Sequence, residues 1–247
     1  MTAFLTCRIV FLSCLLAASV TAFGTVAPAD PIVGRINDEP VTAAEYRLVM
    51  LREASNVFSH LKSTRNLDDH PGYWRDGGEP LGQLRDAVRD ELVRVKVLQG
   101  LARERGLISD TGFDVFMADH AAENARRETA VSKGEVIYGP RNYSVAALYY
   151  IRMGELSFRL TDLLAKEAEP TITSESVEEV YRERRSEFGE KSLPDVRTPI
   201  RAWLAKSRAE QQLTALCAAA RVEMNAVELR KLVPRVDIPA GSAGGEK

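Results

Sequence analysis

The sequence contains little cysteine, with only Cys7, Cys14 and Cys217 among its 247 residues. The first two lie in an N-terminal segment that we expect to be removed, so the mature chain can form no intrachain disulfide. Cys217 lies in the apolar stretch 213–218 of a predicted helix, and no recognisable motif places a base beside it. A catalytic thiol is therefore not indicated.

Histidine and the motifs of common enzymes are also scarce. The chain has three histidines and no G-x-S-x-G, H-E-x-x-H, P-loop or Rossmann fingerprint. Asp68, Asp69 and His70 carry metal-ligating groups, but three consecutive residues rarely converge on one ion, so we predict no metal site. No cofactor is predicted either. An enzyme that uses a carboxylate pair among the 35 acidic residues is left open.

An excess of basic charge is absent as well. The chain has 33 basic and 35 acidic residues, giving a net charge of −2, and it shows no basic stripe. Recognition of nucleic-acid phosphates requires clustered lysine and arginine. Nucleic acid is therefore not an expected partner.

The one long apolar run lies near the N-terminus, at residues 9–18 (IVFLSCLLAA), and Arg8 is the only charged residue among the first 29. Residues 20–22 (VTA) and 27–29 (APA) both fit a cleavage site. We predict that residues 1–29 are a signal peptide. The mature chain would then be periplasmic, secreted or at the outer face of the cell membrane. The run is too short to predict a membrane span, and an uncleaved signal that anchors the chain is the alternative.

The remaining chain is long enough for one sizeable core or two small domains. We interpret residues 30–238 as one mainly helical domain and the small, Gly-rich residues 239–247 as a disordered tail. Two short β-like runs lie near the ends of the domain, at residues 32–37 and 221–225. Because unpaired buried backbone is costly, we predict that these two runs pair as a two-stranded sheet.

Several helix starts are marked by capping residues. Thr42 and Glu45 form a capping-box pattern, while Ser109 and Ser144 precede two further helices. The strongest amphipathic helix spans about 25 residues and ends near Gly106. Its apolar stripe recurs at spacings of three and four residues. The stripe consists of Leu81, Leu84, Val88, Leu92, Val95 and Leu98.

A short and well-specified helix is predicted after Thr173, whose hydroxyl can accept a first-turn N–H. Ile172 and Val177 flank this start and can pack together as a hydrophobic staple. The last long helix is predicted to begin at Thr198 and Pro199, which suit an N-cap and a first helical position.

Aromatic and methionine side chains gather in three stretches: a polar loop, the start of one helix, and a helix that is apolar around more than one face. Such side chains either pack in the core or stay exposed as a contact surface. The candidate contact residues for a client polypeptide are Tyr73, Trp74, Phe113, Phe116, Met117, Tyr149, Tyr150 and Met153.

Four segments, in matching order, resemble the chaperone region of the extracytoplasmic SurA and PrsA foldases. Residues 32–42 (IVGRINDEPVT) are similar to the family's opening strand, turn and N-G-x-x-I-T helix start, with Asp38 where Gly is usual. Residues 136–144 (VIYGPRNYS) resemble a connector of Gram-positive-type members. Residues 172–188 (ITSESVEEVYRERRSEF) resemble the I-T-x-x-x-V-x-x-Y-Y…F helix. Residues 222–225 (VEMN) resemble the closing V-x-I-N strand.

The resemblance implies a SurA N-terminal and trigger-factor C-terminal type of helical chaperone fold, which binds unfolded or exported polypeptides without ATP. In the foldases, a parvulin-type prolyl isomerase domain follows the third of these segments. Here only about a dozen residues separate Phe188 from Ile200, whereas a domain needs about 50 or more. We therefore expect the isomerase domain to be absent and predict no catalytic residue.

Two alternatives are left open. The same fold can serve as a dedicated adaptor or subunit of a secretion or cell-envelope complex, which binds one partner rather than many. The other alternative is a peptidyl-prolyl cis-trans isomerase, as the family name would suggest. A homodimer is also left open, and membrane contact is expected only through an uncleaved signal.

Overall fold

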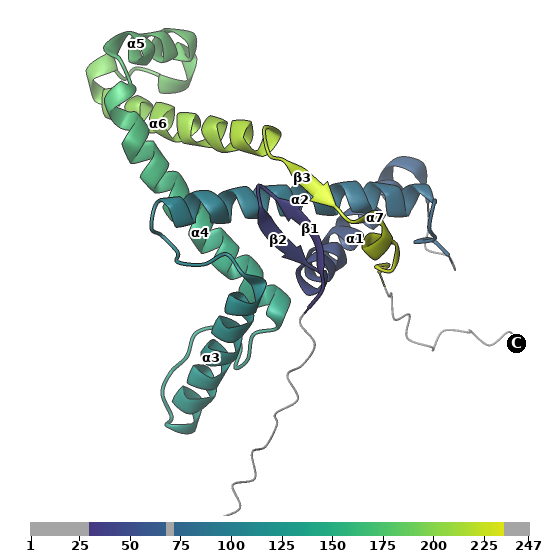
Figure 1. The fold of residues 1–247 in the computed structure, drawn as a ribbon. Helices are drawn as coiled ribbons and strands as arrows, with labels where there is room; N and C mark the ends of the chain where they lie inside the picture. The colour runs from purple at the N-terminus through teal and green to yellow at the C-terminus, as the bar shows by residue number, and fades with distance from the viewer. Residues whose placement is uncertain (1–29, 68–71, 235–247) are drawn as a thin grey trace, which may run out of the picture.

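The computed structural model describes residues 30–67 and 72–234 (Figure 1). The predicted signal peptide, the predicted tail, and the candidate metal ligands Asp68, Asp69 and His70 lie outside these residues. The described chain is mainly helical and carries one small sheet. Its elements are β1 (Ile32–Ile36), β2 (Glu39–Thr42), α1 (Ala43–Arg65), α2 (Glu79–Glu104), α3 (Phe113–Ser132), α4 (Val145–Ala168), η1 (Glu169–Thr171), α5 (Ser174–Glu183), η2 (Arg185–Phe188), α6 (Leu193–Ala218), β3 (Val222–Met224) and α7 (Ala226–Arg230).

The three strands form one antiparallel sheet in the order β2-β1-β3. The predicted pairing of the first and last strands is confirmed. The predicted two-stranded sheet is wrong in its strand number, because residues 39–42 fold back onto β1 as a third strand. Asn37 and Asp38 have φ angles of 48° and 69°, which suit a two-residue hairpin turn. Pro40 is tolerated because β2 lies at the sheet edge.

The main core lies between α1, α2, α4 and the sheet. The predicted amphipathic helix is α2, and all six residues of its apolar stripe are buried. Pro80 lies in its first turn, where the missing N–H costs nothing. Tyr46 from α1 and Leu160 from α4 are fully buried in the same core. The stripe of α2 therefore holds the other elements together.

The start of α3 differs from the prediction. The helix begins at Phe113, with Gly112 as its N-cap, rather than just after Ser109. Thr111 is buried, and its hydroxyl donates to the carboxylate of Glu39 on β2. This contact with a distant strand holds the residues before α3 outside the helix, an effect that the local capping pattern does not reveal.

The start of α6 also differs from the prediction. Ser192 and Asp195 form a capping box, so the helix begins at Leu193. The predicted N-cap Thr198 and the following Pro199 therefore lie inside α6. A capping box satisfies two backbone N–H groups reciprocally, whereas a Thr-Pro pair satisfies one and removes another. The box is the stronger of the two signals.

A second, smaller core lies between α5 and the first half of α6. Thr173 caps α5 as predicted, by accepting a first-turn N–H. Ile172 and Val177 are both buried in this core, and Phe188 packs against it. Only residues 189–192 separate η2 from α6. The short bridge thus joins two segments that share one hydrophobic cluster.

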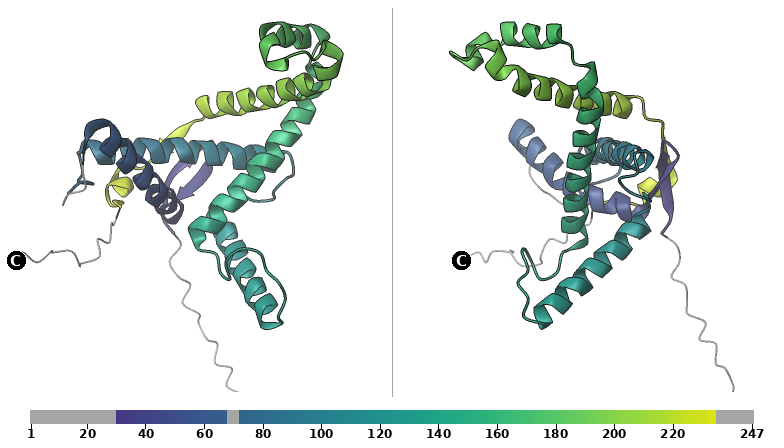
Figure 2. Two further views of the ribbon diagram at one scale, coloured as in Figure 1. Left: turned by 180° about the vertical axis from the view of Figure 1, so that it is seen from behind. Right: turned by 90° about the vertical axis from the view of Figure 1, so that its left-hand side faces the viewer.

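The described elements form an open arrangement (Figures 1 and 2). α4 is a long helix that connects two parts of the molecule. The first turns of α4 lie beside the first turns of α3, and the other end of α4 lies beside α5 and α6. α6 then leads back toward the sheet and ends before β3. None of the described helices has the length and apolar character needed to cross a membrane.

Candidate binding groove

An open cavity lies where α1, the first turns of α3 and the first turns of α4 come together. Its volume is about 1190 Å³, and most of its lining side chains are apolar. We call this cavity the apolar groove. Strand residues Ile32 and Pro40 also contribute to its lining.

The first wall of the apolar groove comes from α1. Thr42 sets the start of this helix by accepting the Glu45 N–H at 3.3 Å. The spacing of four and three residues then places Ala44, Leu48 and Leu51 on one face, and all three line the groove. Leu51 is 57 % exposed, although its side chain is large and aliphatic. The wall therefore offers uncovered apolar surface.

The second wall comes from α3 and α4. Ser144 sets the start of α4 by accepting the Ala147 N–H at 3.2 Å. The small side chain of Ala147 leaves room beside Phe113 and Met117 from α3. Met117 is 38 % exposed and Phe113 is buried. Tyr150, one turn further along α4, lines the groove as well.

Arg52 and Tyr150 line both the apolar groove and a second cavity. The Arg52 guanidinium carbon lies 4.0 Å from the centre of the Tyr150 ring, a distance suited to a cation–π contact. Burial raises the pKa of the Tyr150 hydroxyl above its usual value, and the Arg52 charge opposes this shift. The pair therefore marks the boundary between the two cavities.

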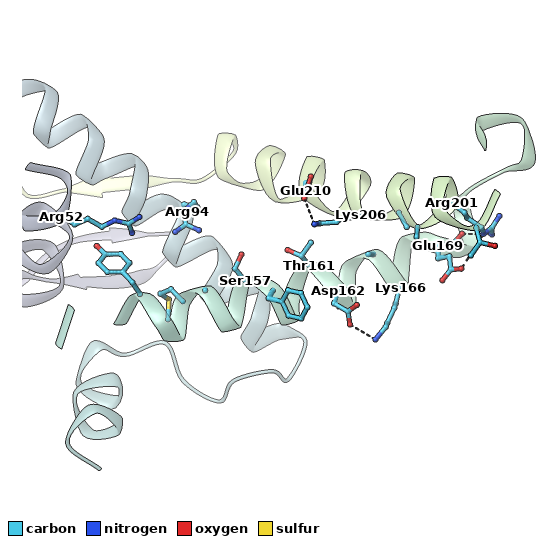
Figure 3. A pocket seen from close by; sticks show the side chains of 18 residues that line it. Arg52, Arg94, Ser157, Thr161, Asp162, Lys166, Glu169, Arg201, Lys206 and Glu210 are labelled. Atoms are coloured by element: carbon cyan, nitrogen blue, oxygen red, sulfur yellow. Dashed lines mark hydrogen bonds and ion pairs between the residues drawn. The ribbon is translucent and has the colours of Figure 1, made fainter. Parts of the chain in front are cut away.

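The second cavity, which we call the charged cleft, lies between α4 and α6 and has a volume of about 800 Å³ (Figure 3). Lys166 pairs with Asp162 at 2.7 Å, and Lys206 lies 3.9 Å from Glu210. All four side chains are more than half exposed. Exposed pairs of this kind contribute little to stability. The cleft adjoins the groove, and its lining combines these exposed charged pairs with apolar side chains, among them Phe158, which is 76 % exposed.

A buried polar cluster ties together the helices beside the groove. Glu45 Oε2 on α1 lies 2.8 Å from Lys96 Nζ on α2, and both side chains are 1 % exposed. The Tyr149 hydroxyl on α4 donates to Glu45 Oε1 at 3.0 Å. The predicted capping box is therefore wrong in one half, because Thr42 caps α1 but the Glu45 carboxylate points into the core. Burial, followed by the Glu45 charge, raises the pKa of Tyr149 well above its usual value.

The structure brings three of the eight predicted contact residues to the apolar groove, namely Phe113, Met117 and Tyr150. Met153 lines the charged cleft instead and is 9 % exposed. All four residues come from α3 and α4, and the first three form part of the second wall of the groove.

The other four predicted contact residues pack in or against the core. Tyr73 and Tyr149 are buried, at 3 % and 0 % exposure. Trp74 is half-buried, and its ring centre lies 4.7 Å from that of Tyr73. Phe116 is half-buried too, 5.1 Å from the Tyr149 ring. Edge-to-face packing of aromatic rings thus accounts for these side chains, and they no longer belong to the candidate surface.

Among the groove residues that the sequence analysis missed, two are large, apolar and exposed, namely Leu51 and Ile32. They are 57 % and 49 % exposed. For Leu51 a signal was present, because it follows Ala44 and Leu48 at helical spacing and so extends an apolar row beside the one that contains Val49 and Met50. A large aliphatic side chain off the buried face of a helix indicates a contact surface when its neighbours are also apolar.

Within residues 30–67 and 72–234, no group of three or more His, Cys, Asp or Glu side chains could hold a metal ion. No family model, curated protein or solved structure matches this chain. The resemblance to the SurA and PrsA foldases therefore stays a prediction.

Proposed function

We propose that this chain is a non-catalytic holding protein, which binds unfolded or exported polypeptide segments outside the cytoplasm without ATP. The observation that carries this proposal is the apolar groove, in which Leu51, Ile32 and Met117 remain exposed in an open cavity. A contiguous exposed apolar surface of this kind is typical of a site that binds another molecule.

The groove suits a polypeptide segment better than a compact small molecule. Its volume of about 1190 Å³ exceeds the roughly 300–1,000 Å³ of most small-molecule pockets. Flexible side chains such as Met117 and Leu51 can repack around different client side chains. Asp30, Arg47 and Asp114 line the same groove and are exposed. Charges of both signs at the rim would keep a complex with an apolar segment soluble.

The family placement is part of the same proposal. It is supported by the order of an opening strand, a capped first helix, the capped helix α5 and a closing strand that pairs with the first. In this proposed correspondence, the four-residue bridge 189–192 takes the place of the foldases' isomerase domain. We infer that the chain corresponds to the holding region of such a foldase. The extracytoplasmic location rests on the sequence of residues 1–29.

The test is suppression of aggregation of a chemically denatured secreted client at an equimolar ratio. Leu51→Asp places a carboxylate in the groove at an exposed position, so the variant should fold. It should weaken client binding at least about tenfold. The matched control is Val227→Asp, because Val227 on α7 is 63 % exposed and does not line the groove. Failure of the wild-type protein to suppress aggregation, or equal activity of both variants, would contradict the proposal.

Two further measurements address the alternatives. If a pull-down yields one stoichiometric partner, and Leu51→Asp abolishes its binding, the protein is a dedicated adaptor rather than a general holder. Appreciable turnover in a prolyl-isomerisation assay would overturn the non-catalytic part of the proposal.

A further inference from the structure

The N-terminal segment of the chain joins the described residues at the edge of the apolar groove. Asp30 and Ile32, the first and third described residues, both line the groove. The Asp30 carboxylate accepts the Ala44 N–H at 2.9 Å. The Pro31 carbonyl accepts the Ala43 N–H at 2.8 Å. These two hydrogen bonds fix the start of the described chain against the first turn of α1. The segment that precedes Asp30 is therefore attached to the groove at a defined point.

That segment contains the one long apolar run of the sequence. Residues 9–18 (IVFLSCLLAA) carry no charge, and we call them the apolar run. The eleven residues 19–29 (SVTAFGTVAPA), which also carry no charge, join this run to Asp30. Eleven residues can span at most about 40 Å. The α1 wall of the groove extends from Ala44 to Arg52, a distance of about 12 Å along the helix. The apolar run can therefore reach every part of the groove.

The apolar run also suits the groove in length and in chemistry. Ten residues are at least about 15 Å long, even as a helix, so the run can cover the α1 wall from end to end. An uncharged run needs no charge partner at the groove, whose lining has charged side chains of both signs. The C-terminal residues 235–247 are a poorer match. They follow α7, no residue of which lines the groove, and they contain no comparable apolar run.

The covalent attachment raises the local concentration of the apolar run at its own groove. Short linkers give an effective concentration of about 1 mM. A run that binds with a dissociation constant of only about 100 μM would then fill the groove in about ten of eleven molecules. At about 1 μM protein, the same run on a second copy is about a thousandfold more dilute. The attachment therefore favours the run of the same chain over that of another copy.

We propose that the apolar run occupies the apolar groove of its own chain for as long as residues 1–29 are retained. The run then competes with a client for the exposed side chains of Leu51, Ile32 and Met117. Cleavage before Asp30 removes this competitor and opens the groove. The inference rests on the proposed function and adds a regulation to it, because the holding protein becomes active only when its N-terminal segment is removed.

The first test locates the apolar run by disulfide formation in the full chain, made by cell-free synthesis so that the N-terminus is retained. Cys14 lies within the run and serves as one partner, in a background of Cys7→Ser and Cys217→Ser. Under mild oxidation, Leu51→Cys should form an intramolecular disulfide with Cys14 at least about tenfold faster than Val115→Cys. Val115 on α3 is 45 % exposed and does not line the groove. Equal rates, or disulfides formed mainly between two chains at about 1 μM protein, overturn the proposal.

The second test measures competition with a denatured client, again in the full chain. Leu15→Asp places a carboxylate within the apolar run, and it should bind the client about tenfold more tightly than the wild type because the run no longer fills the groove. Val26→Asp is the matched control, since it places the same charge between the run and Asp30, and it should bind as the wild type does. Circular dichroism checks that each variant is folded. A Leu15→Asp variant that binds the client no more tightly than Val26→Asp overturns the proposal.

The two tests together separate this inference from the proposed function. If Cys14 crosslinks preferentially to position 51 but no form of the protein binds a client, the holding function fails while the self-occupied groove stands. If the wild type and Leu15→Asp bind the client equally tightly and crosslinking shows no preference, the holding function stands and the self-occupied groove is excluded.

Discussion

Replacing Lys96 with methionine should strongly destabilise the protein. The substitution keeps an unbranched apolar side chain but removes the ammonium group that lies 2.8 Å from Glu45 Oε2. Both side chains are 1 % exposed, so water cannot compensate the carboxylate that remains. Breaking a buried ion pair in this way costs about 3–5 kcal/mol. Against a typical stability of about 5–15 kcal/mol, this is a large fraction.

The assay is urea unfolding followed by far-UV circular dichroism on four proteins: the wild type, Lys96→Met, Glu45→Gln and the double variant. The double variant should recover most of the stability that Lys96→Met loses, because replacing both members of a buried pair with neutral groups is often close to neutral. Tyr149 can still donate its hydroxyl to the amide oxygen at position 45. A large coupling energy between the two sites is therefore expected.

Lys206→Met provides the matched control. Lys206 lies 3.9 Å from Glu210 on α6, and its side chain is 65 % exposed, so its loss should change the free energy of unfolding by no more than about 0.5 kcal/mol. The reasoning is refuted if Lys96→Met costs less than about 1 kcal/mol. It is also refuted if the double variant is no more stable than Lys96→Met.

Two further predictions concern α3 and the sheet. Hydrogen bonding from Arg126 lowers the pKa of Glu123 from its usual 4.5 to about 2. The stability that the ionised Glu123 contributes is therefore fully present above pH 4.5 and is lost as the pH falls through about 2. Hydrogen-exchange protection of α3, corrected for intrinsic rates, should therefore fall less over this range in Glu123→Gln than in the wild type, and equal losses would contradict this cause. Gly34→Ala should cost about 1–3 kcal/mol in urea unfolding, because the added Cβ would lie 2.7 Å from the Glu223 carbonyl oxygen on β3. Gly82→Ala is the control, since nothing lies within 4 Å of a Cβ there, and a cost as large as that of Gly34→Ala would exclude the steric explanation.

Local sequence patterns predicted several elements correctly. The stripe of α2 is buried, Thr173 and Ser144 cap their helices, and the two terminal strands pair. Each of these depends on residues within a few positions of one another, or on the need of a short strand for a partner. The predicted starts of α3 and α6 were wrong, because contacts other than the predicted N-cap set the residue at which each helix begins. At α3 that contact is the distant bond from Thr111 to Glu39.

The groove was harder to predict than the helices. Tyr149 and Tyr150 are neighbours in a segment that is apolar on more than one face. The sequence pattern therefore does not indicate which of the two is buried and which lines a contact surface. In the structure, Tyr149 is fully buried and bonds to Glu45, while Tyr150 faces the groove beside Arg52. Their difference depends on α1 and α2, which come from remote parts of the chain.

The sequence by itself determined the helical class, most capping residues, and the closure of the first strand onto the last. These features follow from short-range hydrogen bonding and from the period of apolar side chains. Only the tertiary structure decided that Glu45 pairs with Lys96 and that Leu51 stays exposed. Burial is a property of packed elements rather than of single segments. The groove therefore became visible only once α1, α3 and α4 had been placed together.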